Sequence, residues 1–215
     1  MTRQKINAAV KHLRSADPVM DELIPRVGPF RLRAERDRFG ILVRSIVSQQ
    51  LSTKAARTIR LRVEELVKPE KPTAENVARL PVKELRSAGL SQQKAGYLHD
   101  LSGAVSDGRL TLRTIGRLPD EAVIEQLIQV KGIGRWTAQM FLIFALGRLD
   151  VLPHDDLGIR AAMRHLYGLE DLPDKATCFE IAEPWRPYAS VACWYCWRSG
   201  DLRRAETNTE KGYPV

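Results

Sequence analysis

Paired cysteines, long apolar runs and strand-like alternation are all missing from this 215-residue sequence. Its three cysteines, Cys178, Cys193 and Cys196, are an odd number without a disulfide framework, which favours a reducing intracellular setting. Three cysteines also cannot supply a four-cysteine cluster, so we expect no iron–sulfur cluster and interpret them as small buried hydrophobes. No apolar run is long enough to span a bilayer and the N-terminus has no secretory apolar core, so we expect a soluble cytoplasmic or nuclear protein.

Helical periodicity and positive charge dominate what is present. Apolar residues recur three or four apart in almost every patterned segment, and no segment alternates as a strand does, so we predict an all-α fold. Ser52, Ser91 and Asp120 are the expected helix caps. The net charge of +8, with a pI near 9.6, suits a polyanionic partner such as nucleic acid.

Two helical segments are joined by the tight turn Lys131-Gly132-Ile133-Gly134. The second segment starts at about Arg135, and the free N–H groups of a helix start bind phosphate well, aided here by Lys131 and Arg135. The stretch therefore predicts a helix-hairpin-helix that holds a DNA backbone without reading its sequence. An ordinary helical hairpin with a glycine turn is the alternative.

A second turn follows and leads to Asp155 and Asp156 at an expected helix start. One of these carboxylates could simply cap the helix, since aspartate does so well. Arg160, four residues after Asp156, could form an ordinary i,i+4 ion pair with it. Position alone does not make these aspartates an active site.

Taken in order, five segments resemble the helix-hairpin-helix superfamily of base-excision DNA glycosylases, and within it the 3-methyladenine DNA glycosylase II (alkylbase DNA glycosidase) family. The resemblance implies two helical lobes around a base-binding cleft, without the N-terminal α/β domain of longer bacterial members. Within a single unit of residues 1–215, we expect residues 36–158 to form the central hairpin-Asp lobe, with 1–35 and 159–215 packing as the second lobe. The five segments are SIVSQQLSTKAA (45–56), GLSQQKAGYLHDL (89–101), LIQVKGIGRWTAQMF (127–141), DVLPHDDLGIR (150–160) and WRPYASVACWYCWR (185–198).

The resemblance implies a role for each matching residue. The family's catalytic carboxylate stands four residues before the basic residue of a D-x-G-[IV]-[RK] pattern, which maps onto Asp156, with Arg160 the basic residue and Asp155 a cap or supporting neighbour. A carboxylate suits this chemistry because cleavage of an N-glycosidic bond builds positive charge on the sugar. Relatives that also cut the DNA backbone carry a nucleophilic lysine where this chain has Trp136, so we expect a monofunctional enzyme.

Other roles follow from the same resemblance. The base pocket is expected from Trp136 and Trp197, with Trp194 and Tyr188 as alternatives that could instead pack the core; the indole face attracts a cationic base. Ala189 and Cys196 depart from the family pattern, which leaves pocket size and base preference open. Gln50, or alternatively Leu51, would fill the gap left by an extruded base, unless the glutamines only cap this interhelix turn. DNA backbone contacts are expected from the hairpin residues Lys131, Gly132, Gly134, Arg135 and Thr137, and Lys94 and Tyr97 are expected to be structural or phosphate-facing.

The expected function is a DNA glycosylase of base excision repair that hydrolyses alkylated purines after base flipping. Its partner would be double-stranded DNA with alkylated bases, and we expect a monomer that needs no cofactor. A structural Na⁺ or K⁺ could bind at the hairpin through the carbonyls of Ile128, Val130 and Ile133. The alternative is a non-catalytic helix-hairpin-helix DNA-binding repair protein, which would explain the charge and the glycines but would not require Asp156 or Trp136.

Overall fold

The computed structural model describes residues 2–207, and within that range the secondary structure is helical, with no strand. The prediction of an all-α fold is therefore confirmed. None of the helices in the same range is long and apolar enough to cross a bilayer. The elements are α1 (Arg3–Ala16), α2 (Pro18–Val27), α3 (Arg38–Ser48), α4 (Thr53–Leu66), α5 (Ala74–Arg79), α6 (Val82–Ser87), α7 (Gln92–Ser106), the 3₁₀ turn η1 (Ile115–Arg117), α8 (Asp120–Leu127), α9 (Arg135–Phe144), α10 (Leu157–Leu166), α11 (Lys175–Ala182), η2 (Glu183–Trp185) and α12 (Ala189–Thr207).

Two of the three predicted helix caps, Ser52 and Ser91, are N-cap residues in the structure. Ser52 and Ser91 accept the backbone N–H groups of residues three positions on, at 3.3 and 3.2 Å. The cap prediction for Asp120 is wrong, because Pro119 is the N-cap residue and Asp120 is the first helical residue. A carboxylate in that first turn still interacts favourably with the helix dipole.

The chain divides into two compact units. The central unit is Glu35–Leu146, and the terminal unit combines the residues before it with those from Gly147 onward. The expected first boundary differs by one residue, whereas the second falls at Gly147, well before the expected 158. The cause is the 149–151 loop, which is tied to the start of α12: Ser190 N donates to Leu149 O at 2.9 Å, and Val151 N donates to Ser190 Oγ at 2.9 Å. Asp156 therefore belongs to the terminal unit.

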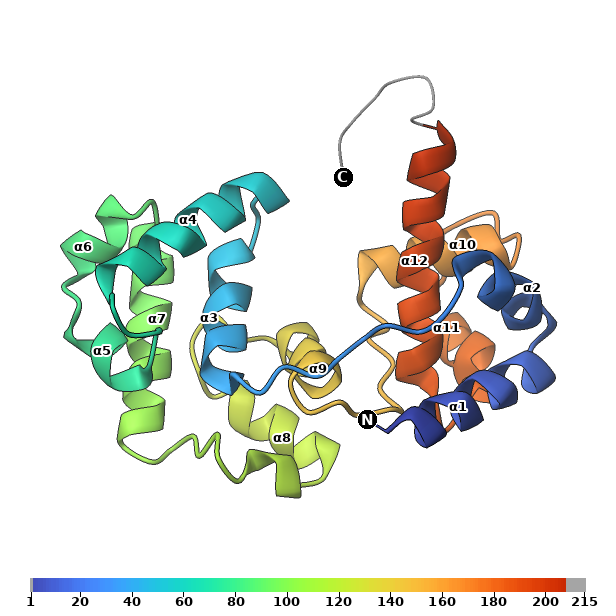
Figure 1. Ribbon diagram of the computed structural model, residues 1–215, viewed down its shortest axis with the longest axis horizontal. Helices are drawn as coiled ribbons and strands as arrows, with labels where there is room; N and C mark the ends of the chain where they lie inside the picture. Colours follow the sequence, from blue (N-terminus) through green and yellow to red (C-terminus); the bar gives the residue numbers. More distant parts are fainter. Residues whose placement is uncertain (1, 208–215) are drawn as a thin grey trace. The chain divides into compact units, whose positions relative to one another are not determined.

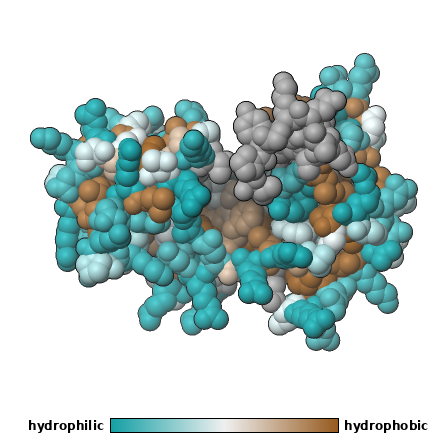
Figure 2. All heavy atoms as spheres, turned by 45° about the horizontal axis from the view of Figure 1, so that its top comes forward, coloured by the Kyte–Doolittle hydropathy of each residue, from teal (hydrophilic) through white to brown (hydrophobic). Residues whose placement is uncertain are grey.

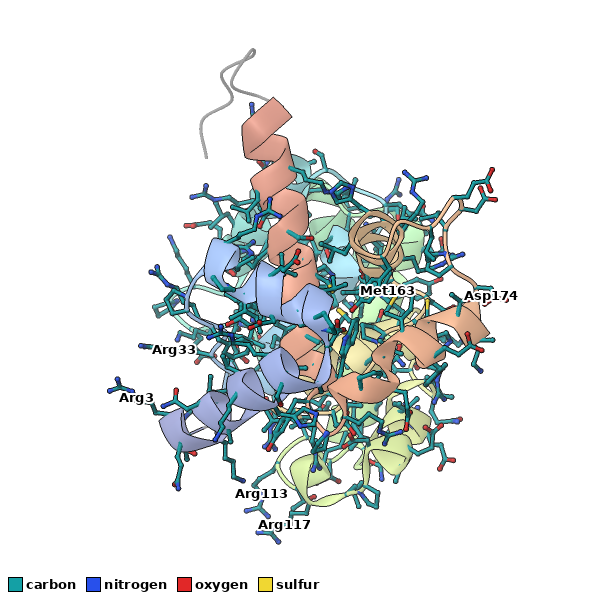
Figure 3. All side chains as sticks on the ribbon, turned by 90° about the vertical axis from the view of Figure 1, so that its right-hand side faces the viewer. Arg3, Arg33, Arg113, Arg117, Met163 and Asp174 are labelled. Atoms are coloured by element: carbon teal, nitrogen blue, oxygen red, sulfur yellow. The ribbon has the colours of Figure 1, made fainter. Side chains whose placement is uncertain are left out.

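The terminal unit is built around α12, which packs against α1, α2 and α10 (Figure 1). Its core holds fully buried residues from all of these helices, Met163 among them, whereas Arg3 and Arg33 extend away from the ribbon (Figure 3). The buried carboxylate of Asp17 caps α2 and accepts hydrogen bonds from Trp185 Nε1 at 2.7 Å and from the Tyr167 hydroxyl. Burial, followed by this hydrogen bond, raises the pKa of Tyr167 far above its ordinary value. Asp17 is thus a structural carboxylate.

The central unit packs α3 against α4, α7 and α9, with α5 and α6 lying against α7 and α8 beside α9. Its core is formed by buried aliphatic and aromatic residues of these helices, among them Val43, Ile46, Leu98, Leu101 and Phe141. The surface is mostly hydrophilic over the described residues in Figure 2, as 28% charged residues would give. Helices α8 and α9 form the hairpin pair, and α9 packs directly on α3.

Candidate active site

Asp156 and Trp197, which are 41 residues apart in the sequence, meet in the terminal unit. The turn before α10 is closed by a hydrogen bond from Asp156 N to Pro153 O at 2.9 Å, which sets Asp156 at the helix cap. Its Oδ1 accepts the backbone N–H of Ile159 at 2.9 Å and the indole Nε1–H of Trp197 at 3.0 Å. The carboxylate is half-buried. The sequence reasoning expected both residues at the site but contained no signal for the bond between them.

The neighbouring carboxylate is placed differently. The side chain of Asp155 is 66% exposed and lies 3.4 Å from Nε2 of the buried His154. It does not cap α10, so the expectation that Asp155 could be the cap is wrong; Asp156 takes that position. Between the two aspartates, only Asp156 is held by donors from two helices, α10 and α12.

Arg160 does not form the i,i+4 ion pair that its spacing from Asp156 allows, as judged from residues 2–207. Its Nε instead donates to the carbonyl of Pro173 at 2.8 Å. Hydrogen bonds from Thr177 hold the pKa of the Asp174 carboxyl below its ordinary value, and the nearby Arg160 guanidinium adds a smaller effect in the same direction. The same guanidinium opposes the rise that burial causes in the pKa of the Cys178 thiol. Arg160 therefore links α10, the helix that Asp156 caps, to the loop before α11.

The two alternative pocket aromatics lie elsewhere in the terminal unit. Trp194 packs on Phe30, with ring centroids 4.8 Å apart, and edge-on against Tyr195 at 4.9 Å. Tyr188 meets the ring of His12 on α1 at 5.4 Å. Because Tyr188 stands immediately before α12 and nine residues before Trp197, about 13 Å of helix axis separates them. Trp197, in contrast, donates a hydrogen bond to Asp156.

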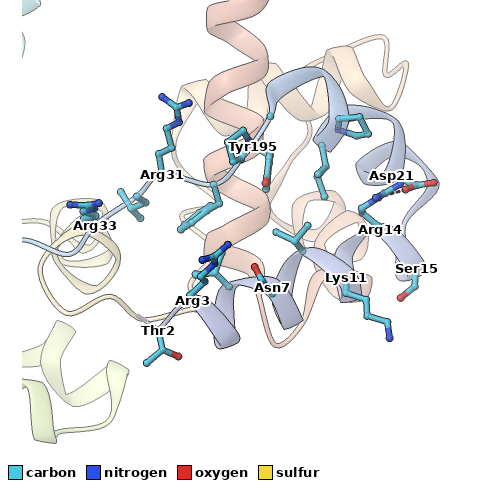
Figure 4. Close-up of a pocket in the computed structure, with 18 residues that line it drawn as sticks. Thr2, Arg3, Asn7, Lys11, Arg14, Ser15, Asp21, Arg31, Arg33 and Tyr195 are labelled. Atoms are coloured by element: carbon cyan, nitrogen blue, oxygen red, sulfur yellow. Dashed lines mark hydrogen bonds and ion pairs between the residues drawn. The ribbon is translucent and has the colours of Figure 1, made fainter.

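A groove of about 1480 Å³ in the terminal unit does not involve Asp156. It runs between α1 and the extended residues 28–33, with Tyr195 at its floor, and Arg14 on its rim is paired with Asp21 at 2.6 Å (Figure 4). Tyr195 and Trp197 are two positions apart on α12, which turns their side chains about 200° from each other. The groove therefore opens on the opposite face of α12 from the carboxylate.

In the central unit, α8 and α9 form the predicted hairpin, and the turn is anchored by neighbouring elements. Gly132 has a φ of 83°, and a Cβ there would lie 2.2 Å from Cδ2 of Tyr97 on α7. Its carbonyl accepts Nε2 of Gln49 at 2.7 Å, and Lys131 N donates to Asp100 Oδ2 at 2.7 Å. Only glycine fits such a turn, because both the backbone angle and the Tyr97 ring exclude a side chain.

The polar residues of the hairpin differ in what they can offer to a phosphate. Lys131 is exposed, and the cap residue Gly134 places no side chain over the start of α9. Arg135 forms two hydrogen bonds of 2.7 Å with Glu121, which hold the pKa of that carboxyl below its ordinary value. Thr137 is only 4% exposed and packs in the core, so its side chain does not fit the predicted backbone contact. Trp136, in contrast, is 42% exposed at the start of α9.

The predicted plug loop is a strained turn between α3 and α4. Gln50 is exposed with a φ of 55°, the one left-handed non-glycine among residues 2–207, and Leu51 beside it is 39% exposed. Lys94 Nζ donates to Val47 O at 2.8 Å and to Gln49 O at 2.5 Å, and burial lowers the pKa of this amine. Such outward display of two side chains from a braced turn is what insertion into a base stack needs.

Lys94 and Tyr97 thus have the structural roles that were one of the two expectations for them. The amine of Lys94 closes the C-terminal end of α3, and Gln49 links that same turn to the hairpin. Sequence reasoning missed this link, because the three segments are far apart in the chain. A cavity of about 530 Å³ lies beside the plug candidate Leu51 and is also lined by Ser45, Ser48 and Met140. The sequence analysis did not single out Met140.

The proposed cation donors are neutral carbonyl oxygens, a donor class that hard cations prefer. The carbonyl of Val130 already accepts the backbone N–H of Ile133 at 3.1 Å, and Val130 and Ile133 are buried whereas Ile128 is exposed. The three cysteines are buried as interpreted, and burial raises the pKa of each thiol. Across residues 2–207 no three His, Cys, Asp or Glu side chains are grouped to hold a metal ion.

The central unit thus holds a braced hairpin, and the terminal unit holds a capped carboxylate beside an indole. Residues 43–187 match the model of the HhH-GPD superfamily base excision DNA repair proteins, and the chain belongs to this family. It is 36% identical over 196 residues to DNA-3-methyladenine glycosylase 1 of Schizosaccharomyces pombe, covering 89% of this chain and 86% of that protein.

Solved structures agree with that assignment. The S. pombe 3-methyladenine DNA glycosylase Mag1, solved in complex with abasic DNA, has a TM-score of 0.81 at 35% identity, with 91% of this chain and 97% of that chain covered. The DNA-3-methyladenine glycosidase of Bacillus halodurans has a TM-score of 0.82 at 37% identity, with 92% and 91% covered. The resemblance read from the five sequence segments is therefore confirmed, and so is the helix-hairpin-helix glycosylase fold.

Proposed function

We propose that this protein is a monofunctional DNA glycosylase of base excision repair that releases alkylated purines, of the 3-methyladenine and 7-methylguanine type, from duplex DNA. The observation that carries the proposal is the half-buried Asp156 carboxylate, held at the start of α10 by donors from α10 and α12. Membership of the base excision repair family supports a role on damaged DNA, and the sequence identity of 36% and 35% to 3-methyladenine glycosylases supports alkylated purines as the substrates.

The reaction breaks the bond between C1′ of the deoxyribose and the purine nitrogen, and the bond's electron pair leaves with the base. Alkylation has already made that base cationic, so it leaves as a neutral purine and needs little protonation. Positive charge then develops on the sugar, and the ionised Asp156 carboxylate stabilises it and orients a water molecule. The water adds its oxygen to C1′ and loses a proton, which leaves an abasic site.

Recognition of the extruded base falls to the aromatic residues. Trp136 is exposed, and an indole face attracts a cationic purine more strongly than a neutral one. In the terminal unit, Trp197 lies beside the Asp156 carboxylate and offers an aromatic face of its own. Relatives that also cut the DNA backbone form a Schiff base through a lysine at the position that Trp136 occupies here, and an indole cannot do so; we therefore expect no strand cleavage after base release.

The residues proposed to extrude the base and to bind the DNA backbone lie in the central unit. Gln50, with Leu51 as the alternative, fills the gap in the base stack, since both side chains project from the strained turn. The exposed Lys131 and the start of α9 at Gly134 bind a phosphate.

A Na⁺ or K⁺ ion held by the carbonyls of Ile128, Val130 and Ile133 would add positive charge at the same hairpin. DNA binding should then weaken when K⁺ is replaced by a bulky organic cation at equal ionic strength.

The protein is proposed to act as a monomer on damaged genomic DNA, in the nucleoid of a bacterium or the nucleus of a eukaryote. The decisive test is release of free methylpurines from methylated duplex DNA by the wild type, Asp156→Asn and Asp155→Asn. We expect release by the wild type and Asp155→Asn and a large loss in Asp156→Asn. Salt-sensitive DNA binding without release by any of them would instead favour the non-catalytic repair protein. Covalent trapping of the protein on DNA by borohydride would contradict the monofunctional assignment.

A further inference from the structure

The Asp156 carboxylate is tied to a residue whose expected role is only to stack on a base. Its Oδ1 accepts one hydrogen bond from α10, through Ile159 N at 2.9 Å, and one from α12, through Trp197 Nε1 at 3.0 Å. Two donors from separate helices fix the position of this oxygen and restrict rotation of the carboxylate about its Cβ–Cγ bond. The indole therefore acts on the carboxylate itself, whatever its ring face does.

Gly158 is the residue that gives the indole its room. A Cβ at this position would lie 3.1 Å from Asp156 Oδ1 and 3.2 Å from Trp197 Cδ1, both closer than ordinary van der Waals contact. Gly158 lies in the first turn of α10 and is not among the glycines with positive φ. Its backbone needs no glycine, and alanine would form helix better. The space between carboxylate and indole is the physical reason for a glycine here.

We propose that Trp197 is a positioning residue for Asp156, and that Gly158 is the small residue that lets the indole N–H reach the carboxylate. This inference rests on the proposed glycosylase function and adds a role for Trp197 that does not depend on base stacking. A carboxylate fixed in advance needs no reorganisation when positive charge appears on the sugar. Loss of the indole N–H should therefore slow bond cleavage while leaving DNA binding nearly intact.

The first test separates positioning from stacking. Trp197→Phe keeps an aromatic ring but removes the N–H, and should lower the single-turnover rate of base release about 10- to 100-fold, the effect of one hydrogen bond to a charged group. If Trp197 acts through Asp156, the fold-loss is the same for 3-methyladenine and 7-methylguanine, and the affinity for abasic-site DNA changes little. A loss that differs between the two bases, or that appears only in affinity, would overturn the positioning role. In an Asp156→Asn background, Trp197→Phe should slow release little further.

Trp185→Phe provides a matched control. Trp185 also donates its indole N–H to a carboxylate of the terminal unit, Asp17, at 2.7 Å. That pair is buried and lies apart from Asp156 in the sequence and in its contacts, so the control should lower the midpoint of thermal unfolding. At a temperature where it is folded, it should keep the wild-type rate of base release. An equal loss of rate in both variants would show that Trp197 acts only through stability.

Gly158→Ala tests the space itself. We expect the rate of base release to fall by about the same factor as in Trp197→Phe, while thermal stability stays equal or rises because alanine favours the helix. Gly96→Ala is the control, since Gly96 lies within α7 and a Cβ there would meet nothing within 4 Å. It should raise stability without changing the rate. A wild-type rate in Gly158→Ala would overturn the role given to this glycine.

A spectroscopic measurement keeps the inference testable even if the wild type releases no methylpurine, which would refute the proposed function. Four tryptophans give four indole N–H signals in ¹⁵N-labelled protein, and Trp197→Phe identifies one of them. That signal should move in Asp156→Asn and in Gly158→Ala and stay in place in Asp155→Asn. If Asp156→Asn leaves it unmoved, the contact between indole and carboxylate is absent and the inference fails, independently of the enzyme's substrate.

Discussion

Replacing Gly132 by alanine should lower the protein's free energy of unfolding. Two separate features of the turn set the size of this loss. The φ of 83° is a left-handed conformation, which costs an alanine about 1–2 kcal/mol. The added Cβ would also stand 2.2 Å from Cδ2 of Tyr97, and relief of such overpacking costs a further 1–3 kcal/mol or so. The free energy of unfolding should therefore fall by about 2–5 kcal/mol in total.

Urea unfolding of the wild type, Gly132→Ala, Tyr97→Ala and the double variant separates the two contributions. Without the Tyr97 ring, Gly132→Ala should cost only the backbone part, about 1–2 kcal/mol. Gly134→Ala is the matched control, because a Cβ at Gly134 meets nothing within 4 Å, and its cost should be far smaller. If Gly132→Ala costs the same with and without the Tyr97 ring, contact between ring and turn is not what requires glycine.

Three further predictions concern DNA binding and pH. Leu51→Ala and Gln50→Ala should slow base release from a stable duplex more than from a mismatched site, where extrusion costs less; equal slowing on both would exclude them as plugs. Glu121→Gln should tighten binding to undamaged duplex, measured by fluorescence anisotropy at fixed salt, because it removes a negative charge and releases the Arg135 guanidinium; unchanged affinity would show that Arg135 does not reach the phosphates. Arg135 lowers the pKa of Glu121 from its ordinary 4.5, so the pair's contribution is present above that pH and is lost as pH falls through the lowered pKa. In an NMR titration the Glu121 midpoint should rise in Arg135→Gln, and an unchanged midpoint would contradict this pairing.

Local chemistry explains why much of the hairpin and of the α10 start could be predicted. Helix periodicity, glycine in a turn and aspartate before a helix act over a few residues, and each is visible in the sequence. The same periodicity places the Thr137 side chain: it lies one turn before Phe141, on the face of α9 that is buried. Its side chain was thus better suited to the core than to a phosphate.

Contacts between distant segments were beyond the sequence. Arg160 is four residues from Asp156, yet its Nε donates to Pro173, which the loop before α11 brings alongside. The boundary at Gly147 depends on bonds between the 149–151 loop and Ser190 at the start of α12. Spacing along one helix predicts which side chains could pair, but tertiary packing determines which hydrogen bonds and ion pairs form.

The two carboxylate–indole pairs of the terminal unit differ in burial, a property that the sequence motif around Asp156 does not record. Asp17 and Asp156 each cap a helix, and each accepts an indole N–H, from Trp185 and Trp197. Asp17 is only 5% exposed, so a sugar cannot approach it. Asp156 keeps part of its surface accessible while Ile159 N and Trp197 Nε1 hold its carboxylate. A carboxylate that is to stabilise charge on a substrate must be both fixed and reachable, and burial, which no short motif records, separates the structural aspartate from the candidate catalytic one.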